Sequence, residues 1–260
     1  MVGERGMRTL PRSKGVERPR PFAGQKSAHT VSCAGHPGRQ RCSVVEEYKP
    51  CYETDPIGGS RRMSENLPVI YLARHGETAW SVTGQHTGRT DLPLTERGER
   101  NARRLGQRLS GLVFAKVFTS PSQRATRTCE LAGFGAAAEV DPNLVEWNYG
   151  DYEGLRTVQI HEKKPDWQLF RDGCPNGESP DQVGARADRT VRGLREIDGD
   201  VLIFSSGHFL RVLAGRWLGL EPAAGRFFML KTASLSALGY ENTSSQPVIQ
   251  FWDDTGCVGD

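Results

Sequence analysis

No apolar run in the 260-residue sequence approaches the roughly 18 residues that a membrane-spanning helix needs, and the mean hydropathy is −0.53. We therefore expect no membrane contact. Cysteine is scarce as well: there are 6, and no two are spaced as a CxxC pair. The three that follow residue 62, Cys129, Cys174 and Cys257, lie far apart, so no disulfide framework is expected and a cytoplasmic location is the default.

Residues 1–62 lack the large apolar side chains of a packed domain. They hold only 8 Leu, Ile, Val and Phe residues and none of the five Trp, whereas Gly and Pro fill 14 positions. Such a composition cannot offset the entropy lost on folding. We expect residues 1–62 to be disordered, or to be upstream sequence ahead of a true start at Met63, and residues 63–260 to form the domain. A zinc site is disfavoured, because no close CxxC pair occurs among His29, Cys33, His36, Cys42 and Cys51.

The domain also lacks a strong excess of one charge. The net charge of +3 is unevenly distributed, because residues 1–62 hold 12 of the 34 Lys and Arg residues but only 6 of the 31 Asp and Glu residues. Residues 63–260 therefore carry 22 basic against 25 acidic residues. The basic total gives no reason to expect that the domain binds nucleic acid.

From residue 67 onward, short apolar runs alternate with amphipathic segments. The short runs predict strands at Leu67–Ala73, Phe114–Thr119, Ala137–Val140, Val201–Ser205, Leu235–Tyr240 and Val248–Trp252. The amphipathic segments predict helices at Thr95–Ser110, Pro121–Ala132, Ser179–Ile197 and His208–Leu218. Ser179, Pro180 and Gln182 form a helix start signal, with an N-cap, a first-turn proline and a capping-box residue. This alternation predicts an α/β sandwich with a mostly parallel sheet.

Polar residues follow several of these strands, where such folds place their chemistry. Arg74 and His75 follow the first predicted strand, and Arg124 lies shortly after the second. Glu146 follows the third, and His208 follows the fourth. Each residue alone could be an ordinary cap or surface group. Because the carboxyl ends of parallel strands share one edge, we expect all five to converge on one site.

The segments that carry these residues resemble the histidine phosphatase superfamily, also called phosphoglycerate mutase-like. They are LARHGET, TGRTDLPLTERG, TSPSQRATRT, LVEWNYGDYEG and SSGHFLR, in the order of the family, and the resemblance as a whole covers roughly residues 67–252. The resemblance implies a three-layer α/β/α sandwich. It implies that His75 is the phosphorylated nucleophile, Arg74 and Arg124 bind phosphate, Glu146 donates a proton, and His208 is the second histidine.

These residue types suit phosphoryl transfer on chemical grounds. Two arginines offer forked donors to phosphoryl oxygens and neutralise charge that would repel a nucleophile. A neutral imidazole can attack phosphorus without a metal, and a carboxyl group can protonate the leaving oxygen. No cofactor is expected, and no convincing metal-ligand spacing occurs in the sequence.

A second set of residues is predicted around this centre. Thr87 and Gly88 resemble the family loop that touches phosphate, and Ser81 stands where many relatives carry Asn. Trp147 and Tyr149 flank Glu146 and are expected either to shape the leaving-group pocket or to pack in the core. His86 and His161 are predicted to be surface residues.

The substrate prediction depends on the segment between the acid and the second histidine. Only 62 positions separate Glu146 from His208, and bases cluster only at Lys163-Lys164, which favours hydrolysis over phosphoryl shuttling. Segments such as WQLFRDGCPNGES resemble the sedoheptulose-1,7-bisphosphatase branch. We therefore expect a small phosphorylated sugar, such as a ketose bisphosphate, with Arg171, Lys163 or Lys164 holding a distal phosphate. A mutase-type transferase, a phosphoprotein phosphatase and a weakly catalytic phosphoryl-binding module stay open, and oligomeric state is not predicted.

Overall fold

The computed structural model describes residues 67–256, which form one six-stranded sheet. The predictions for residues 1–62, and that for Cys257, lie outside the described residues, so the boundary at residue 62 stays a prediction. The sheet order is β3-β2-β4-β1-β5-β6. Strands β1 to β4 pair in parallel, and β5 and β6 are antiparallel to their neighbours. The predicted mostly parallel sheet is confirmed.

The strands lie close to the predicted positions. They are β1 (Ile70–Arg74), β2 (Lys116–Thr119), β3 (Ala138–Val140), β4 (Val201–Ser205), β5 (Leu235–Tyr240) and β6 (Pro247–Asp254). The long helices are α2 (Glu96–Arg108), α3 (Gln123–Leu131), α6 (Pro180–Leu194) and α7 (Gly207–Trp217). Short elements complete the chain: α1 (Ala79–Thr83), α4 (Thr157–Lys163), α5 (Leu169–Asp172), and the 3-10 helices η1 (Pro142–Leu144), η2 (Gly150–Tyr152) and η3 (Pro222–Phe227).

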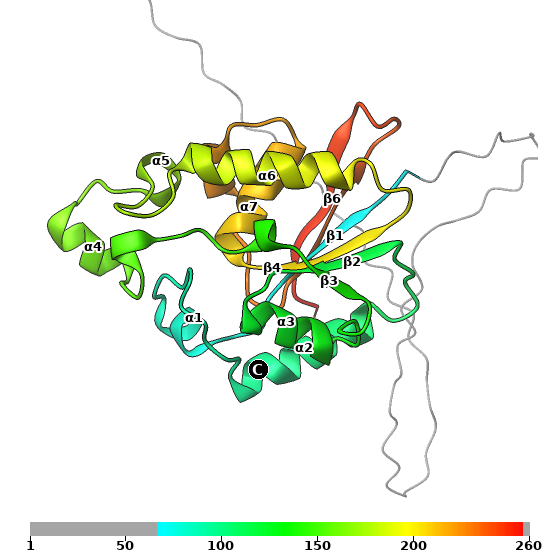
Figure 1. Cartoon of the computed structure of the whole chain (residues 1–260), viewed down its shortest axis with the longest axis horizontal. Helices are drawn as coiled ribbons and strands as arrows, with labels where there is room; N and C mark the ends of the chain where they lie inside the picture. Colours follow the sequence, from blue (N-terminus) through cyan, green and yellow to red (C-terminus); the bar gives the residue numbers. More distant parts are fainter. Residues whose placement is uncertain (1–66, 257–260) are drawn as a thin grey trace, which may run out of the picture. The chain divides into compact units, whose positions relative to one another are not determined.

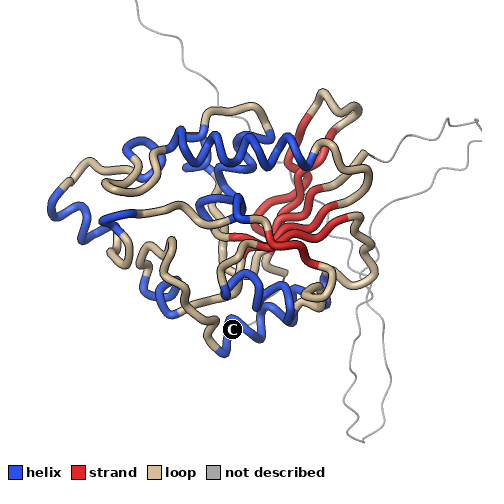
Figure 2. The backbone as a smooth tube through the Cα atoms, viewed as in Figure 1, coloured by secondary structure: helices blue, strands red, loops and turns tan. Residues whose placement is uncertain are grey.

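Helices cover both faces of the sheet, as a three-layer sandwich requires (Figure 1). In β4, Val201 and Ile203 pack with the residues of α6 and α7, whereas Leu202 and Phe204 pack with those of α2 and α3. Because successive strand residues point to opposite faces, a strand buried on both sides reads as a continuous apolar run. Figure 2 shows the strands gathered between the two helical layers.

Local capping sets several helix ends. Ser179 and Gln182 form the predicted capping box of α6, with Pro180 as the first helical residue. The N-cap of α3 is Ser122, so that helix begins two residues after Pro121 and not at it. The hydroxyl of Thr95 accepts a hydrogen bond from the amide of Gly98 and starts α2 at the predicted place.

A long connection between β3 and α6 lies beyond the carboxyl ends of the parallel strands. It contains η1, η2, α4 and α5, and Figure 1 shows α4 and α5 at the end of the domain remote from the β5–β6 turn. The connection contacts the loop after α1, because Gln85 and Arg156 form an isolated bridge and His86 donates its amide proton to the carbonyl of Leu155. These two segments build one side of the site.

Candidate active site

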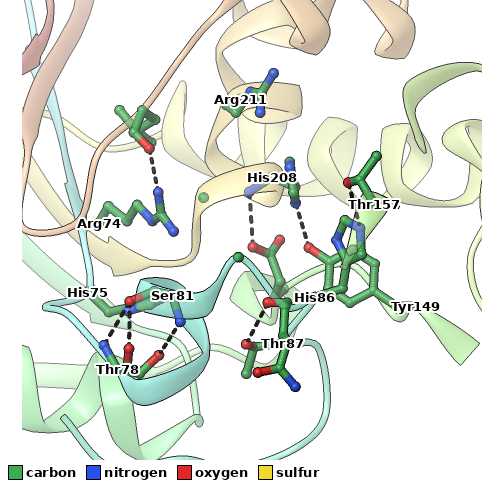
Figure 3. A pocket seen from close by; sticks show the side chains of 15 residues that line it. Arg74, His75, Thr78, Ser81, His86, Thr87, Tyr149, Thr157, His208 and Arg211 are labelled. Carbon is green, nitrogen blue, oxygen red and sulfur yellow. Dashed lines mark hydrogen bonds between the residues drawn. The ribbon is translucent and has the colours of Figure 1, made fainter. Parts of the chain in front are cut away.

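A polar pocket of about 250 Å³ opens at the carboxyl ends of β1 and β4 (Figure 3). Four of the five predicted catalytic residues line it: Arg74, His75, Glu146 and His208. The parallel register pairs Arg74 with Ser205, and the amide of His75 donates to the carbonyl of Ser205 at 2.9 Å. The ends of the two central strands therefore place Arg74, His75 and His208 at one edge of the sheet, and Glu146 reaches the same edge from the loop after η1.

His75 is held in one orientation at the floor of the pocket. Its Nδ1 lies 2.7 Å from the carbonyl oxygen of Gly76, and only 4% of the residue is exposed. A carbonyl oxygen only accepts hydrogen bonds, so Nδ1 carries the proton and Nε2 has a free lone pair. Burial, together with the charges of Arg124 and Arg74, holds the pKa of His75 well below its usual value. The ring is therefore neutral over the physiological pH range.

Arg74 is the last residue of β1, and its side chain lines the pocket. Its Nη1 donates to the carbonyl of Leu230, and its Nε is buried without a hydrogen-bond partner. Burial lowers the pKa of Arg74, and the nearby charge of Glu146 acts in the opposite direction. Arg74 therefore places a fixed cation beside His75.

Arg124 is near His75 but does not line the pocket. Its guanidinium is 1% exposed and donates to the carbonyls of Thr90 at 3.0 Å, Thr87 at 3.2 Å and Gly88 at 2.9 Å. These bonds tie the loop at residues 87–90 to the start of α3. The Nε of Arg124 has no partner. In this arrangement Arg124 holds a loop and lowers the pKa of His75 by its charge.

The carboxylate of Glu146 is bound by three backbone amides. Oε1 accepts from Trp147 at 2.8 Å and from Phe209 at 2.8 Å, and Oε2 accepts from His208 at 3.0 Å. Backbone amides at the start of a helix such as α7 are donors that a bound anion could use. They bind Glu146 instead, because its carboxylate occupies the positive end of that helix.

His208 is the second residue of α7, lines the pocket and is hydrogen-bonded to Tyr149. Its Nδ1 and the hydroxyl of Tyr149 are 2.5 Å apart, and its ring packs edge-on against Phe170. Burial is the largest cause that holds the pKa of His208 well below its usual value. Burial likewise raises the pKa of Tyr149 well above its usual value, so both groups are neutral.

The second set of predicted residues divides into two groups. Ser81, Thr87 and Tyr149 line the pocket, although the Ser81 hydroxyl already bonds to the backbone of Thr78, the N-cap of α1, in a capping box. Gly88 lines a neighbouring cavity, where its amide donates to Glu153 at 2.8 Å. Trp147 is fully buried and packs in the core, which favours the second of its two predicted roles.

The predicted distal cations do not reach the pocket. Arg171 is exposed, and its guanidinium is paired with Asp172, with Nε and Oδ1 2.7 Å apart. Lys163 and Lys164 are exposed at the end of α4 and do not line the pocket. Arg171 thus does not line the pocket, and its guanidinium is bonded to Asp172 within α5.

The structure adds two residues that the sequence reasoning missed. His86 was expected at the surface, but it is 9% exposed, lines the pocket and packs against Tyr149 and Trp167. Burial lowers the pKa of His86 to about 4. Arg211 lines the pocket three residues after His208, on the same side of α7. That helical spacing could have identified Arg211 from the sequence.

Metal-binding clusters and membrane-spanning helices are both absent from the part of the chain that the structure describes. Among residues 67–256, no group of three or more His, Cys, Asp and Glu side chains is arranged to hold a metal ion. Within the same range, no helix is long and apolar enough to cross a membrane.

Comparisons with known proteins agree with this geometry. Residues 70–255 match the family described as the histidine phosphatase superfamily, branch 1. An acid phosphatase of Mycobacterium tuberculosis is 45% identical over 177 residues, which cover 66% of this chain and 87% of that protein. The sedoheptulose 1,7-bisphosphatase of Saccharomyces cerevisiae is 37% identical over 190 residues, or 61% of this chain and 70% of that protein. A solved Mycobacterium tuberculosis open reading frame product has a TM-score of 0.68 and 41% identity, covering 72% of this chain and 97% of its own.

Proposed function

This chain belongs to the histidine phosphatase superfamily, and we propose that it hydrolyses phosphate monoesters through a phosphohistidine formed on Nε2 of His75. The hydrogen bond between Nδ1 of His75 and the carbonyl of Gly76 carries this proposal. It fixes the tautomer whose free nitrogen can attack, and the low pKa of His75 keeps that nitrogen unprotonated.

In the first step, Nε2 of His75 forms a bond to phosphorus while the bond from phosphorus to the ester oxygen breaks. The guanidinium of Arg74 lies at the same end of β1 and stabilises the negative charge on the phosphoryl oxygens. Glu146 supplies the proton that the leaving oxygen needs. Its Oε1 already accepts two amides and its Oε2 only one, so Oε2 has room for that proton.

In the second step, water attacks phosphorus and the bond between phosphorus and Nε2 breaks. Glu146, now ionised, accepts a proton from that water, and inorganic phosphate leaves. The carboxylate thus serves as acid and then as base, and His75 returns to its starting tautomer. Turnover is expected to continue when a chelator is present, because no step uses a metal.

A trapping experiment tests the nucleophile. The full chain is mixed briefly with labelled phosphate ester and quenched in alkali, in which phosphohistidine is stable. The wild type should carry an acid-labile phosphoryl label, and His75→Ala should carry none and show no turnover. His161→Ala is the matched control, because His161 lies outside the pocket and bonds to the carbonyl of Trp167. A label that persists in His75→Ala would refute the assignment.

The substrate that we propose is a sugar phosphate with a second anionic group, such as a ketose bisphosphate. Arg211 supports this class. Its Nε donates to the carbonyl of Gly225 at 2.9 Å, its Nη2 donates to the carbonyl of Arg226 at 3.1 Å, and its guanidinium stacks 4.5 Å above the ring of Phe170. Because these contacts already fix the Arg211 side chain, it loses little further conformational entropy when it binds an anion.

A pair of substrates tests this choice. The ratio of kcat/KM for a ketose bisphosphate to that for the matching monophosphate should exceed about tenfold, or about 1.4 kcal/mol. Arg211→Met should bring the ratio close to one, whereas Arg171→Met should leave it unchanged. If the wild type has equal kcat/KM values for the bisphosphate and the monophosphate, the protein is a general phosphatase and the substrate proposal is wrong. Phosphate that appears on another carbon of the sugar, and not in solution, would indicate a mutase.

A further inference from the structure

Three buried polar side-chain atoms among residues 67–256 have no hydrogen-bond partner, and all three belong to residues around His75. They are Nε of Arg74, Nε of Arg124 and Oγ of Ser206. Buried polar atoms in folded proteins are almost always paired, so a group of unpaired ones needs an explanation. All three can donate a hydrogen bond, which is what an oxyanion requires.

Ser206 lies beside the nucleophile. The parallel register of β1 and β4 pairs Arg74 with Ser205, so the next residues along, His75 and Ser206, are neighbours at the end of the sheet. Ser206 is fully buried. The residue after it, Gly207, lines the pocket, and a Cβ there would lie 3.0 Å from Nε of Arg74. The backbone at Gly207 is therefore close to the Arg74 guanidinium, and Ser206 directly precedes it in the chain.

The hydroxyl of Ser206 is free for a specific reason. Ser206 is the N-cap of α7, and an N-cap serine normally accepts a hydrogen bond from the second or third amide of its helix. Here those amides belong to His208 and Phe209, and both donate to the carboxylate of Glu146. Glu146 thus performs the capping that Ser206 would otherwise perform, and the hydroxyl makes no cap hydrogen bond.

We propose that the hydroxyl of Ser206 donates a hydrogen bond to an oxygen of the reacting phosphoryl group, next to the contact made by Arg74. This inference rests on the proposed phosphatase function and adds a catalytic residue to it. The resemblance made His208 the second histidine of the site, but that ring is two residues further along and is bonded to Tyr149. A hydroxyl at the end of β4 is a neutral donor, so it holds the phosphoryl oxygen without adding a titrating group.

The test compares two serine hydroxyls that are equally buried but differently bonded. In the full chain, Ser206→Ala should raise the inhibition constants of inorganic phosphate and orthovanadate about tenfold. It should leave the Tm of the ligand-free protein unchanged or higher, because no internal hydrogen bond is lost. Ser206→Thr, which keeps the hydroxyl, should restore both constants to within about threefold of the wild type.

Ser236→Ala is the matched control. Ser236 is also fully buried, but its Oγ accepts the amide of Asp253 at 3.0 Å. Its removal should lower Tm and leave both inhibition constants unchanged. If Ser206→Ala instead lowers Tm and leaves the inhibition constants at the wild-type value, Ser206 is structural and the proposal is wrong.

Two further measurements keep the result interpretable. If Ser206→Ala does not fold, Ser206→Cys conserves the size of the side chain with a weaker donor and should show the same rise in the inhibition constants. If the wild type hydrolyses no phosphate ester, the proposed function fails. The rise in Tm caused by inorganic phosphate still compares the wild type with Ser206→Ala, and an equal rise in both would overturn the role of Ser206 on its own.

Discussion

Acidification should destabilise this protein through His86, whose imidazole is buried in the pocket wall. Burial lowers the pKa of His86 to about 4, and the charge of Glu153 opposes that shift only in part. In the unfolded chain the same ring has a pKa of about 6.5. Between these two values the unfolded chain binds the proton and the folded protein does not. The stabilisation is therefore complete above pH 6.5, and it is lost as the pH falls from 6.5 towards 4.

The size of the effect follows from the two pKa values. At pH 5 the unfolded ring is almost fully protonated and the folded ring is not, which costs the folded state about 2 kcal/mol relative to pH 7. Near pH 4 the loss from His86 alone approaches about 3 kcal/mol. The pKa values of His75 and His208 are lowered in the same direction, so the total loss should be larger. A domain with a total stability of about 5–15 kcal/mol would lose a substantial part of it.

Urea unfolding at pH 7 and pH 5, followed by tryptophan fluorescence, measures this loss. His86→Gln removes the titrating ring, and the variant should lose about 2 kcal/mol less than the wild type between the two pH values. His161→Gln is the control and should keep the wild-type pH dependence, because His161 lies outside the pocket. A His86→Gln variant with the full wild-type loss would refute the reasoning, as would a wild type that is equally stable at both pH values.

Glu146→Gln should slow hydrolysis of an alkyl phosphate far more than hydrolysis of nitrophenyl phosphate, since nitrophenolate hardly needs a proton to leave. Steady-state kcat values on the two substrates measure this, and equal losses would remove Glu146 from the acid role. Gly207→Ala should lower kcat/KM at least about tenfold, or about 1.4 kcal/mol, with little change in Tm, because a Cβ there would lie 3.0 Å from the Arg74 guanidinium. Gly193→Ala, at an exposed position of α6 with no atom within 4 Å of its Cβ, should raise stability by about 0.5–1 kcal/mol and leave activity intact. A loss of activity in both glycine variants would show that the effect at Gly207 is not local.

The sheet and the long helices could be predicted from local sequence signals. A strand such as β4 is buried on both faces, so its apolar run has no polar interruption. The helix α6 carries its own start signal in Ser179, Pro180 and Gln182. Such signals depend only on residues close together in the sequence, so they can be recognised from the sequence alone.

Several site residues could not be placed in this way, because their positions depend on contacts far along the chain. Arg171 is an exception, because its guanidinium is bonded to the adjacent Asp172. His86 lies in a loop that looks polar in the sequence, and the connection between β3 and α6 covers it with Tyr149 and Trp167. Sequence reasoning thus found the polar residues that follow strands. It missed His86, which a distant segment buries, and Arg211, whose spacing from His208 was not used.

The carboxylate of Glu146 links protonation of the leaving group to the phosphoryl contact proposed for Ser206. It lines the pocket where the leaving oxygen needs a proton, and it also caps α7 in place of Ser206. If the carboxylate were absent, the amides of His208 and Phe209 would be unpaired, and the Ser206 hydroxyl is the nearest acceptor along the chain that an N-cap position offers them. A hydroxyl engaged as a cap no longer has the freedom to orient towards a phosphoryl oxygen. Glu146→Ala should therefore weaken inorganic phosphate binding as well as slow leaving-group departure.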